Sequence, residues 1–144
     1  MIHWSTLGWD EVIFSHIDPD TGAQTDYAIS TMLAWIKANE HEVEKLRAAI
    51  QPEAAQMVEA CRGIEQHRLI PLLSVPDPDP VIFVMQPDDT ALLVDGSHRY
   101  VAMWKQGQPD LRAYVLTHEQ AQHFIIDGIQ VMPPDKVVGG YSGL

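Results

Sequence analysis

Residues 91–117 read ALLVDGSHRYVAMWKQGQPDLRAYVLT, and this stretch decides the fold. An apolar run at 91–94 meets the polar residues Asp95-Gly96-Ser97-His98-Arg99, and a second apolar stretch follows them. Gly107 then interrupts the chain before another apolar run that ends at Leu116. Short apolar runs separated by glycine and polar turn residues predict a strand, a tight turn, a helix and a second strand. The polar turn therefore coincides with the start of the helix.

The start of a helix is a place where anions bind. Its first N–H groups have no intrahelical acceptor, and the helix dipole adds partial positive charge there. Gly96 predicts a turn with positive φ and also leaves room for a phosphate to approach the backbone. Ser97 is suited to be the helix N-cap, and its hydroxyl is also suited to contact a phosphate oxygen. With His98 and Arg99 in the first turn, the sequence predicts that these four residues bind a phosphate or a carboxylate.

Three residues of the turn each have a structural and a chemical interpretation. Arg99 lies beside an apolar run, where an unpaired guanidinium is costly, so it either pairs with Asp95 or awaits an anionic ligand. Asp95 has the further option of holding Mg²⁺ or accepting a hydroxyl proton, as phosphoryl transfer requires. His98 titrates near neutrality and is suited either to a neutral hydrogen bond or to general acid–base catalysis. Asp95 and His98 are therefore the candidate catalytic residues.

The rest of the chain predicts short strands and helices in alternation. Strands are expected at 12–17 and 24–27, around a turn at 18–22, and at 81–85, which forms a hairpin with 91–94. Helices are expected at 31–38 with Ser30 as N-cap, at 42–50, at 52–61, and at 118–127 with Thr117 as N-cap. Pro71 makes 69–75 an edge strand or an extended segment, and the prolines of 76–80 make an exposed, stiff connection.

The composition is that of an acidic globular protein. Of 144 residues, 46% are hydrophobic and 20% are charged, which predicts a single folded domain over 1–144. The nine Lys and Arg form no basic run and the formal net charge is -11, so binding of duplex nucleic acid is disfavoured.

Cysteine content and hydropathy restrict the compartment. Cys61 is the only cysteine, so no intrachain disulfide can form. No stretch approaches the roughly 18 apolar residues of a membrane span, and the N-terminus lacks a signal-peptide pattern. A cytoplasmic protein without a membrane association is therefore expected. His118 and His123 are five residues apart and do not share a helix face, so no metal site is predicted.

The region 92–116, together with the flanking strand from Val81, resembles the ParB/sulfiredoxin superfamily. The shared pattern is a strand leading into Gly96-Ser97-His98-Arg99, then Ala102, Gly107 and another strand at 111–116. The Asp-Gly-x-His-Arg variant is especially similar to the ParB-like branch that includes free-serine kinases. The resemblance implies an α/β (α+β) fold with a small mixed sheet and a ParB/sulfiredoxin-like core at 64–128. The remainder is then expected to be a helical elaboration with an N-terminal strand at 1–63 and a flexible tail at 129–144.

The resemblance also implies a ligand. In that superfamily the loop and the helix start bind nucleotide phosphates: ATP in sulfiredoxin, CTP in ParB, and ADP or ATP in the kinases. It follows that Gly96, Ser97, His98 and Arg99 are expected to line a site for ATP, ADP or CTP with magnesium. Ser97 stands where sulfiredoxins carry their catalytic cysteine, which excludes sulfiredoxin chemistry.

The missing part of the pattern is a catalytic acid. Kinases of this branch need an acidic residue from elsewhere in the fold, and Asp10, Glu11 and Asp18 are candidates only by their position beside the first strand. The leading hypothesis is therefore a nucleotide- or phosphate-binding ParB-like protein, with a nucleotide-dependent phosphotransferase or hydrolase as its catalytic form. The alternative is a non-catalytic regulatory or interaction protein that keeps the fold and binds a protein partner. A ParB-like nuclease ranks third, because the net charge of -11 argues against it.

Overall fold

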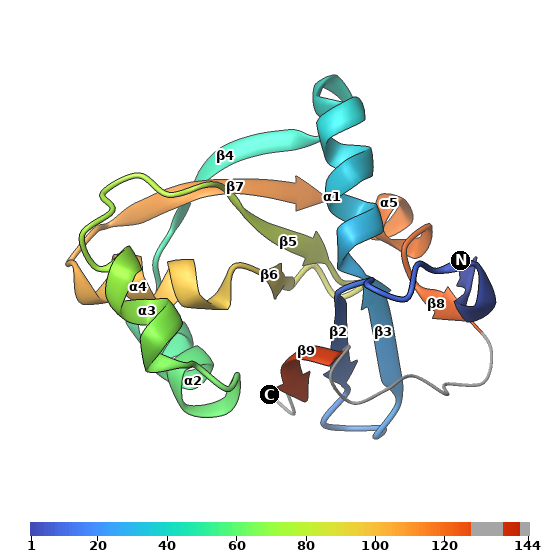
Figure 1. The fold of residues 1–144 in the computed structure, drawn as a ribbon, viewed down its shortest axis with the longest axis horizontal. Helices are drawn as coiled ribbons and strands as arrows, with labels where there is room; N and C mark the ends of the chain where they lie inside the picture. The colour runs from blue at the N-terminus through green and yellow to red at the C-terminus, as the bar shows by residue number, and fades with distance from the viewer. Residues whose placement is uncertain (128–136, 142–144) are drawn as a thin grey trace.

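A computed structural model describes residues 1–127 in full and the backbone of 137–141, and it shows a mixed α+β fold, which confirms the predicted class (Figure 1). The main sheet has the strand order β4-β7-β5-β6. Its strands are β4 (Glu44–Ala49), β7 (Asp110–Leu116), β5 (Val81–Met85) and β6 (Ala91–Asp95). β5 and β6 form the predicted antiparallel hairpin, and β4 pairs antiparallel with β7. β7 lies parallel to β5, because β6 has already returned the chain to the end of the sheet where β5 begins.

Three helices cover one face of this sheet. They are α2 (Pro52–Cys61), α3 (Gln66–Leu72) and α4 (Ser97–Lys105), and they lie together below the sheet in Figure 1. Their shared core contains Val58 of α2, Leu69 of α3 and Val101 of α4, packed with Val81 and Leu111 of the sheet. The strand-turn-helix-strand order predicted for 91–116 is confirmed as β6, the turn, α4 and β7.

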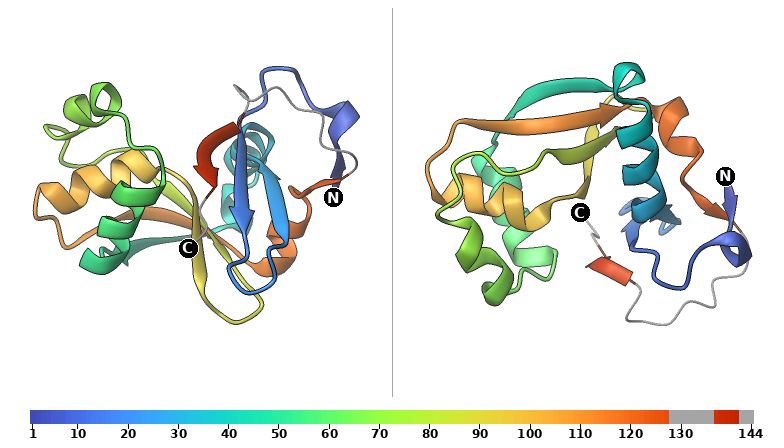
Figure 2. Two further views of the ribbon diagram at one scale, coloured as in Figure 1. Left: turned by 90° about the horizontal axis from the view of Figure 1, so that it is seen from below. Right: turned by 45° about the horizontal axis from the view of Figure 1, so that its top comes forward.

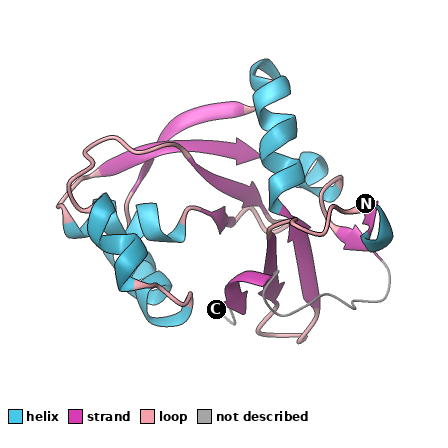
Figure 3. Cartoon of the chain, in the orientation of Figure 1, coloured by secondary structure: helices cyan, strands magenta, loops and turns pink. Residues whose placement is uncertain are grey.

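The N-terminal part forms a second unit of structure beside β6. The predicted hairpin is confirmed as β2 (Ile13–Ile17) and β3 (Gln24–Ala28), and α1 (Ile29–Ala38) follows β3 directly. The smaller elements are β1 (Ile2–His3), η1 (Trp4–Thr6), η2 (Glu40–Glu42), α5 (His118–Gln122), β8 (Ile126–Asp127) and β9 (Val137–Tyr141). Figures 2 and 3 show the hairpin standing apart from the α2–α4 layer, with β6 between them. A separate core cluster joins α1 and α5 to the sheet.

The expected helical elaboration at 1–63 contains more strand than the sequence predicted. Strands β1 to β4 all lie in it, and β4 is part of the main sheet. Of the expected C-terminal tail, residues 129–136 and 142–144 lie outside the described residues. The backbone of 137–141 forms β9, which runs parallel to β2.

A buried carboxylate, not Ser30, caps the first helix. Glu11 is 5% exposed, and its Oε2 accepts hydrogen bonds from the backbone N–H groups of Ser30 (2.6 Å) and Thr31 (3.2 Å). The predicted N-cap role of Ser30 is wrong, because the helix begins at Ile29, two residues earlier than expected, and the Ser30 hydroxyl accepts from the Val12 N–H instead. An acidic residue distant in sequence therefore satisfies the first N–H groups of α1.

Replacing Glu11 with alanine is expected to lower the free energy of unfolding by about 2 kcal/mol, because two buried N–H groups lose a charged acceptor. Urea unfolding followed by circular dichroism measures the change. Asp10→Ala is the matched control, because Asp10 is exposed and its loss is expected to cost less than about 0.5 kcal/mol. Equal losses for the two variants would contradict the capping role.

The helix predicted at 42–50 is wrong, because this segment forms strand β4. The spacing of Val43, Leu46 and Ile50 fits a helical stripe, but every residue of β4 is paired with β7, with Leu46 opposite Ala113. Leu46 is 38% exposed, as expected on an edge strand with little burial. Pairing with a distant strand has overridden a local preference, which is common where the apolar pattern is sparse.

The edge strand predicted at 69–75 is also wrong, because residues 66–72 form helix α3. Pro71 lies in its last turn, where the missing N–H removes a single intrahelical hydrogen bond. Leu69 is 1% exposed and Leu72 is half-buried in the same cluster, so their helical spacing buries both against α4.

The last predicted helix is shorter than expected. The Thr117 N-cap is confirmed, with a reciprocal capping box between Thr117 and Gln120. The helix ends at Gln122 instead of continuing to 127, because β8 pairs with β1 and Ile125 bridges to Tyr27.

Candidate functional site

The turn between β6 and α4 presents free backbone donors. Gly96 has φ of +99° and occupies the N-cap position, and no side chain caps the helix. The predicted N-cap role of Ser97 is wrong, because the left-handed Gly96 takes that position and Ser97 becomes the first helical residue. The first hydrogen bond of the helix runs from the Tyr100 N–H to the Gly96 carbonyl. The N–H groups of residues 97–99 therefore have no acceptor among the described residues and are available to an anion.

Gly96 is required by packing as well as by conformation. A Cβ placed there would lie 2.4 Å from Val81 Cγ1 and 2.8 Å from Val81 Cβ. Its positive φ confirms the predicted turn glycine. The close approach fixes the start of α4 against β5.

The guanidinium of Arg99 makes its hydrogen bonds within the protein. Its Nη2 donates to Asp95 Oδ2 at 2.9 Å, and its Nη1 donates to the carbonyls of Asp79 (3.1 Å) and Pro80 (2.8 Å). The Arg99 and Asp95 side chains are 21% and 23% exposed. Of the two interpretations of Arg99, the internal pair with Asp95 is the one observed. Asp95 is thereby held in place. Because its guanidinium is used in these hydrogen bonds, the main role of Arg99 in this structure is to position the turn.

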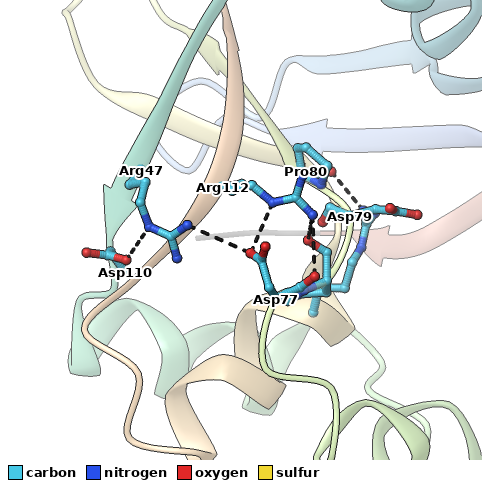
Figure 4. A network of polar contacts seen from close by, with 8 residues as sticks. Arg47, Asp77, Asp79, Pro80, Asp110 and Arg112 are labelled. Carbon is cyan, nitrogen blue, oxygen red and sulfur yellow. Dashed lines mark hydrogen bonds and ion pairs between the residues drawn. The ribbon is translucent and has the colours of Figure 1, made fainter.

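The connection between α3 and β5 is anchored by arginine side chains of the sheet (Figure 4), and its Asp79 and Pro80 carbonyls accept the hydrogen bonds from Arg99. Arg112 of β7 donates from Nε to Asp77 Oδ1 (3.0 Å) and from Nη2 to the Pro78 carbonyl (2.7 Å). Arg47 of β4 lies opposite Arg112 and pairs with Asp110 at 2.7 Å. The predicted exposed connection at 76–80 is non-helical as expected, but Pro78 is buried. Arg112 holds the segment to the sheet, and Arg99 holds it to α4.

His98 links α4 to α3. Its Nε2 accepts a hydrogen bond from the Glu65 backbone N–H at 3.0 Å, so that nitrogen is unprotonated. Burial and the nearby positive charge of Arg68 hold the pKa of His98 below its ordinary value, against the opposing effect of the Glu65 carboxylate. His98 is therefore a neutral acceptor at neutral pH, and its other ring nitrogen keeps the proton.

The turn opens onto a cleft of about 400 Å³. The predicted site residues Asp95, Gly96, Ser97, His98 and Arg99 all line it. The opposite walls come from the end of α2, the start of α3 and strand β2. All five predicted residues are thus brought together in one concave site.

Arg62, which sequence reasoning missed, is the cation at the base of this cleft. It is 4% exposed, its Nη1 donates to the Leu93 carbonyl at 2.7 Å, and its guanidinium lies 4.7 Å from the centre of the Phe14 ring. Its Nε is buried without a hydrogen-bond partner, and it forms no ion pair with any carboxylate in the part of the chain that is described. Burial lowers the pKa of Arg62 to about 10, so the guanidinium remains charged at neutral pH.

A charged arginine buried without a counter-ion is costly unless an anion accompanies it. Arg62 provides both the charge and an unused donor in the cleft that the start of α4 also lines. In the sequence it resembles any arginine at the end of a surface helix, so no local signal could have singled it out.

A second cleft, of about 570 Å³, continues from the first. Three elements line both clefts: β2, β6 and α4. Along β2, Phe14 faces the first cleft and His16 the second, and along β6 the division falls between Val94 and Leu93. Arg62 lines both, so its side chain stands at the junction of one elongated groove.

The three acidic candidates from the sequence do not supply a carboxylate to the first cleft. Glu11 caps α1, and Asp18 accepts from the Asp20 and Thr21 N–H groups in the hairpin turn. Asp10 is exposed and lines neither cleft. The acid that does line the first cleft beside Asp95 is Glu65, at the start of α3.

No group of three or more His, Cys, Asp or Glu side chains within residues 1–127 is arranged to hold a metal ion. Among the helices that are described, none has the length and apolar character needed to cross a bilayer.

Comparisons with known proteins give one structural likeness. No known protein family and no curated protein matches the chain. The crystal structure of sulfiredoxin from Arabidopsis thaliana is similar over 56% of this chain and 94% of its own, with 20% sequence identity and a TM-score of 0.41. A similarity at this level does not establish membership of a family.

Proposed function

We propose that this protein binds the phosphate groups of a nucleotide in the first cleft. The observation that carries the proposal is the buried, charged Arg62 without a counter-ion, which lines the same cleft as the uncapped start of α4. A phosphate satisfies both features at once, because its oxygens accept from a guanidinium and from several backbone N–H groups.

The second cleft supports a ligand that is larger than phosphate. Its lining includes the apolar side chains of Leu93, Met57 and Phe83 and the polar side chains of Gln86 and Thr90. Asp18, Asp20 and Asp88 also line it. An apolar surface with a few polar groups at its edge suits a ring system that also needs specific hydrogen bonds. Together with the motif resemblance to ParB-like proteins, this favours a nucleoside phosphate such as ATP, ADP or CTP. Magnesium would then be held mainly by the phosphate oxygens.

Binding without turnover is the better supported form of this function. Asp95 is held by Arg99, and the Nε2 of His98 already accepts from Glu65, so neither predicted catalytic residue is free in the ligand-free site. A regulatory protein that binds a nucleotide is thus favoured over a phosphotransferase or hydrolase. Asp95 and His98 as catalytic residues remain a prediction.

Isothermal titration with ATP, ADP, CTP, pyrophosphate and adenosine, each with and without Mg²⁺, tests the proposal. We expect at least one nucleotide to bind below the millimolar range, because it occupies both clefts. Pyrophosphate is expected to bind more weakly and adenosine most weakly, because each fills one cleft only.

The order of the affinities of these ligands shows whether a nucleotide occupies both clefts. Product analysis after incubation with the nucleotide that binds, at substrate excess, reports any turnover. Absence of binding by every phosphate compound at millimolar concentration would overturn the proposed function.

A further inference from the structure

The start of α3 is held beside the start of α4, and both line the first cleft. The Glu65 N–H donates to His98 Nε2, and Leu69 of α3 is buried against α4. Gly63, with φ of +63°, turns the chain between α2 and α3. Both Glu65 and Arg68 consequently line the same cleft as the α4 N-terminus.

The three arginines that line this cleft are bound to different degrees. Arg99 makes three hydrogen bonds to the protein, and Arg62 is buried and fixed by Leu93. Among the residues that the structure describes, Arg68 is held only by Glu65, at 3.6 Å between Nη1 and Oε1, and both side chains are about half exposed, at 50% and 51%. Arg68 is therefore the one cation of the cleft that is free to move toward a ligand.

Glu65 is positioned to act as the anion that a ligand must replace. Its Oε1 faces Arg68, and its Oε2 lies 3.4 Å from His67 Nε2. An exposed ion pair of this kind contributes little to stability, so its exchange costs little. A phosphate oxygen offers Arg68 a shorter, charge-assisted contact than the carboxylate does in the empty cleft.

We infer that Glu65 is an internal competitor for the phosphate, and that Arg68 exchanges Glu65 for the ligand when the cleft is filled. The inference rests on the proposed function and extends it, because it assigns regulation of affinity to α3. Glu65 is thus an affinity-determining residue, and Arg68 is a phosphate ligand in the bound state only.

Pyrophosphate titration of four variants tests this exchange. Glu65→Gln is expected to tighten pyrophosphate binding about fivefold, because it releases Arg68 and removes a negative charge from the cleft mouth. Arg68→Ala is expected to weaken binding by a similar factor. The double variant is expected to bind only slightly more tightly than Arg68→Ala, because without Arg68 the loss of Glu65 removes only its direct repulsion of the phosphate.

The matched control is Glu59→Gln, which removes the same charge from an ion pair with Lys105 on α4, outside the cleft lining. It is expected to leave pyrophosphate affinity unchanged. The inference is overturned if Glu65→Gln binds no tighter than the wild type, or if it tightens binding equally when Arg68 is absent. Failure of the wild type and all variants to bind pyrophosphate or ATP overturns the proposed function and this inference with it, whereas normal binding with no effect of Glu65 overturns the inference alone.

Discussion

Replacing Arg62 with methionine is expected to weaken ATP binding about 100-fold while leaving the protein folded. The guanidinium is the only fully buried cation of the described cleft, so its loss removes charge-assisted hydrogen bonds that no neighbour can replace. Methionine preserves the length and the apolar stem of the side chain, and it retains contact with the Phe14 ring. Titration calorimetry measures the affinity.

The stability of the same variant separates a binding role from a structural one. A buried charge without a counter-ion is a cost to folding, so its removal offsets the lost hydrogen bond to the Leu93 carbonyl. We expect the free energy of unfolding to change by less than about 1 kcal/mol. Arg47→Met changes the net charge equally on the exposed edge strand and is expected to bind ATP normally. The binding role of Arg62 would be contradicted if Arg62→Met bound ATP with wild-type affinity. It would also be contradicted if Arg62→Met failed to fold and Arg62→Lys bound ATP normally.

Replacing Gly96 with alanine is expected to have the largest effect on stability. The new methyl group would meet Val81 at 2.4 Å, in a residue whose φ of +99° already disfavours a side chain. Left-handed strain and overpacking together are expected to cost about 3 kcal/mol, or about 10 °C in the midpoint of thermal unfolding.

Gly107→Ala provides the matched comparison for this substitution. Gly107 has φ of +75° and nothing within 4 Å of an added Cβ, so only the conformational cost applies there, about 1 kcal/mol. Scanning calorimetry on both variants measures the difference. A Gly96→Ala protein as stable as Gly107→Ala would show that Val81 yields to the methyl group and that the close packing is unimportant.

The sequence predicted the turn and its surroundings because their signals are local. Two glycines with positive φ, Gly96 and Gly107, delimit α4, and short apolar runs form the strands on either side. The five predicted site residues lie consecutively in the chain, so a correct turn was enough to bring them into one cleft.

The remaining features depend on contacts between distant segments. The apolar spacing from Val43 to Ile50 fits a helix, and pairing with β7 makes the segment a strand. Glu11 caps a helix that starts 18 residues later, because the β2–β3 hairpin brings the two together. Arg62 gains its importance only from burial between Phe14 and Leu93, which belong to two other strands. No pattern in residues 52–63 could reveal such burial.

The central claim is that phosphate binds between Arg62 and the start of α4. Nitrogen-15 NMR during titration with the nucleotide that binds most tightly tests this directly. We predict that the backbone amides of Ser97 and His98 and the side-chain Nε–H of Arg62 shift together, with one saturation curve that matches calorimetry. Saturable binding that leaves these three resonances unchanged, while residues outside the groove shift, would contradict the claim.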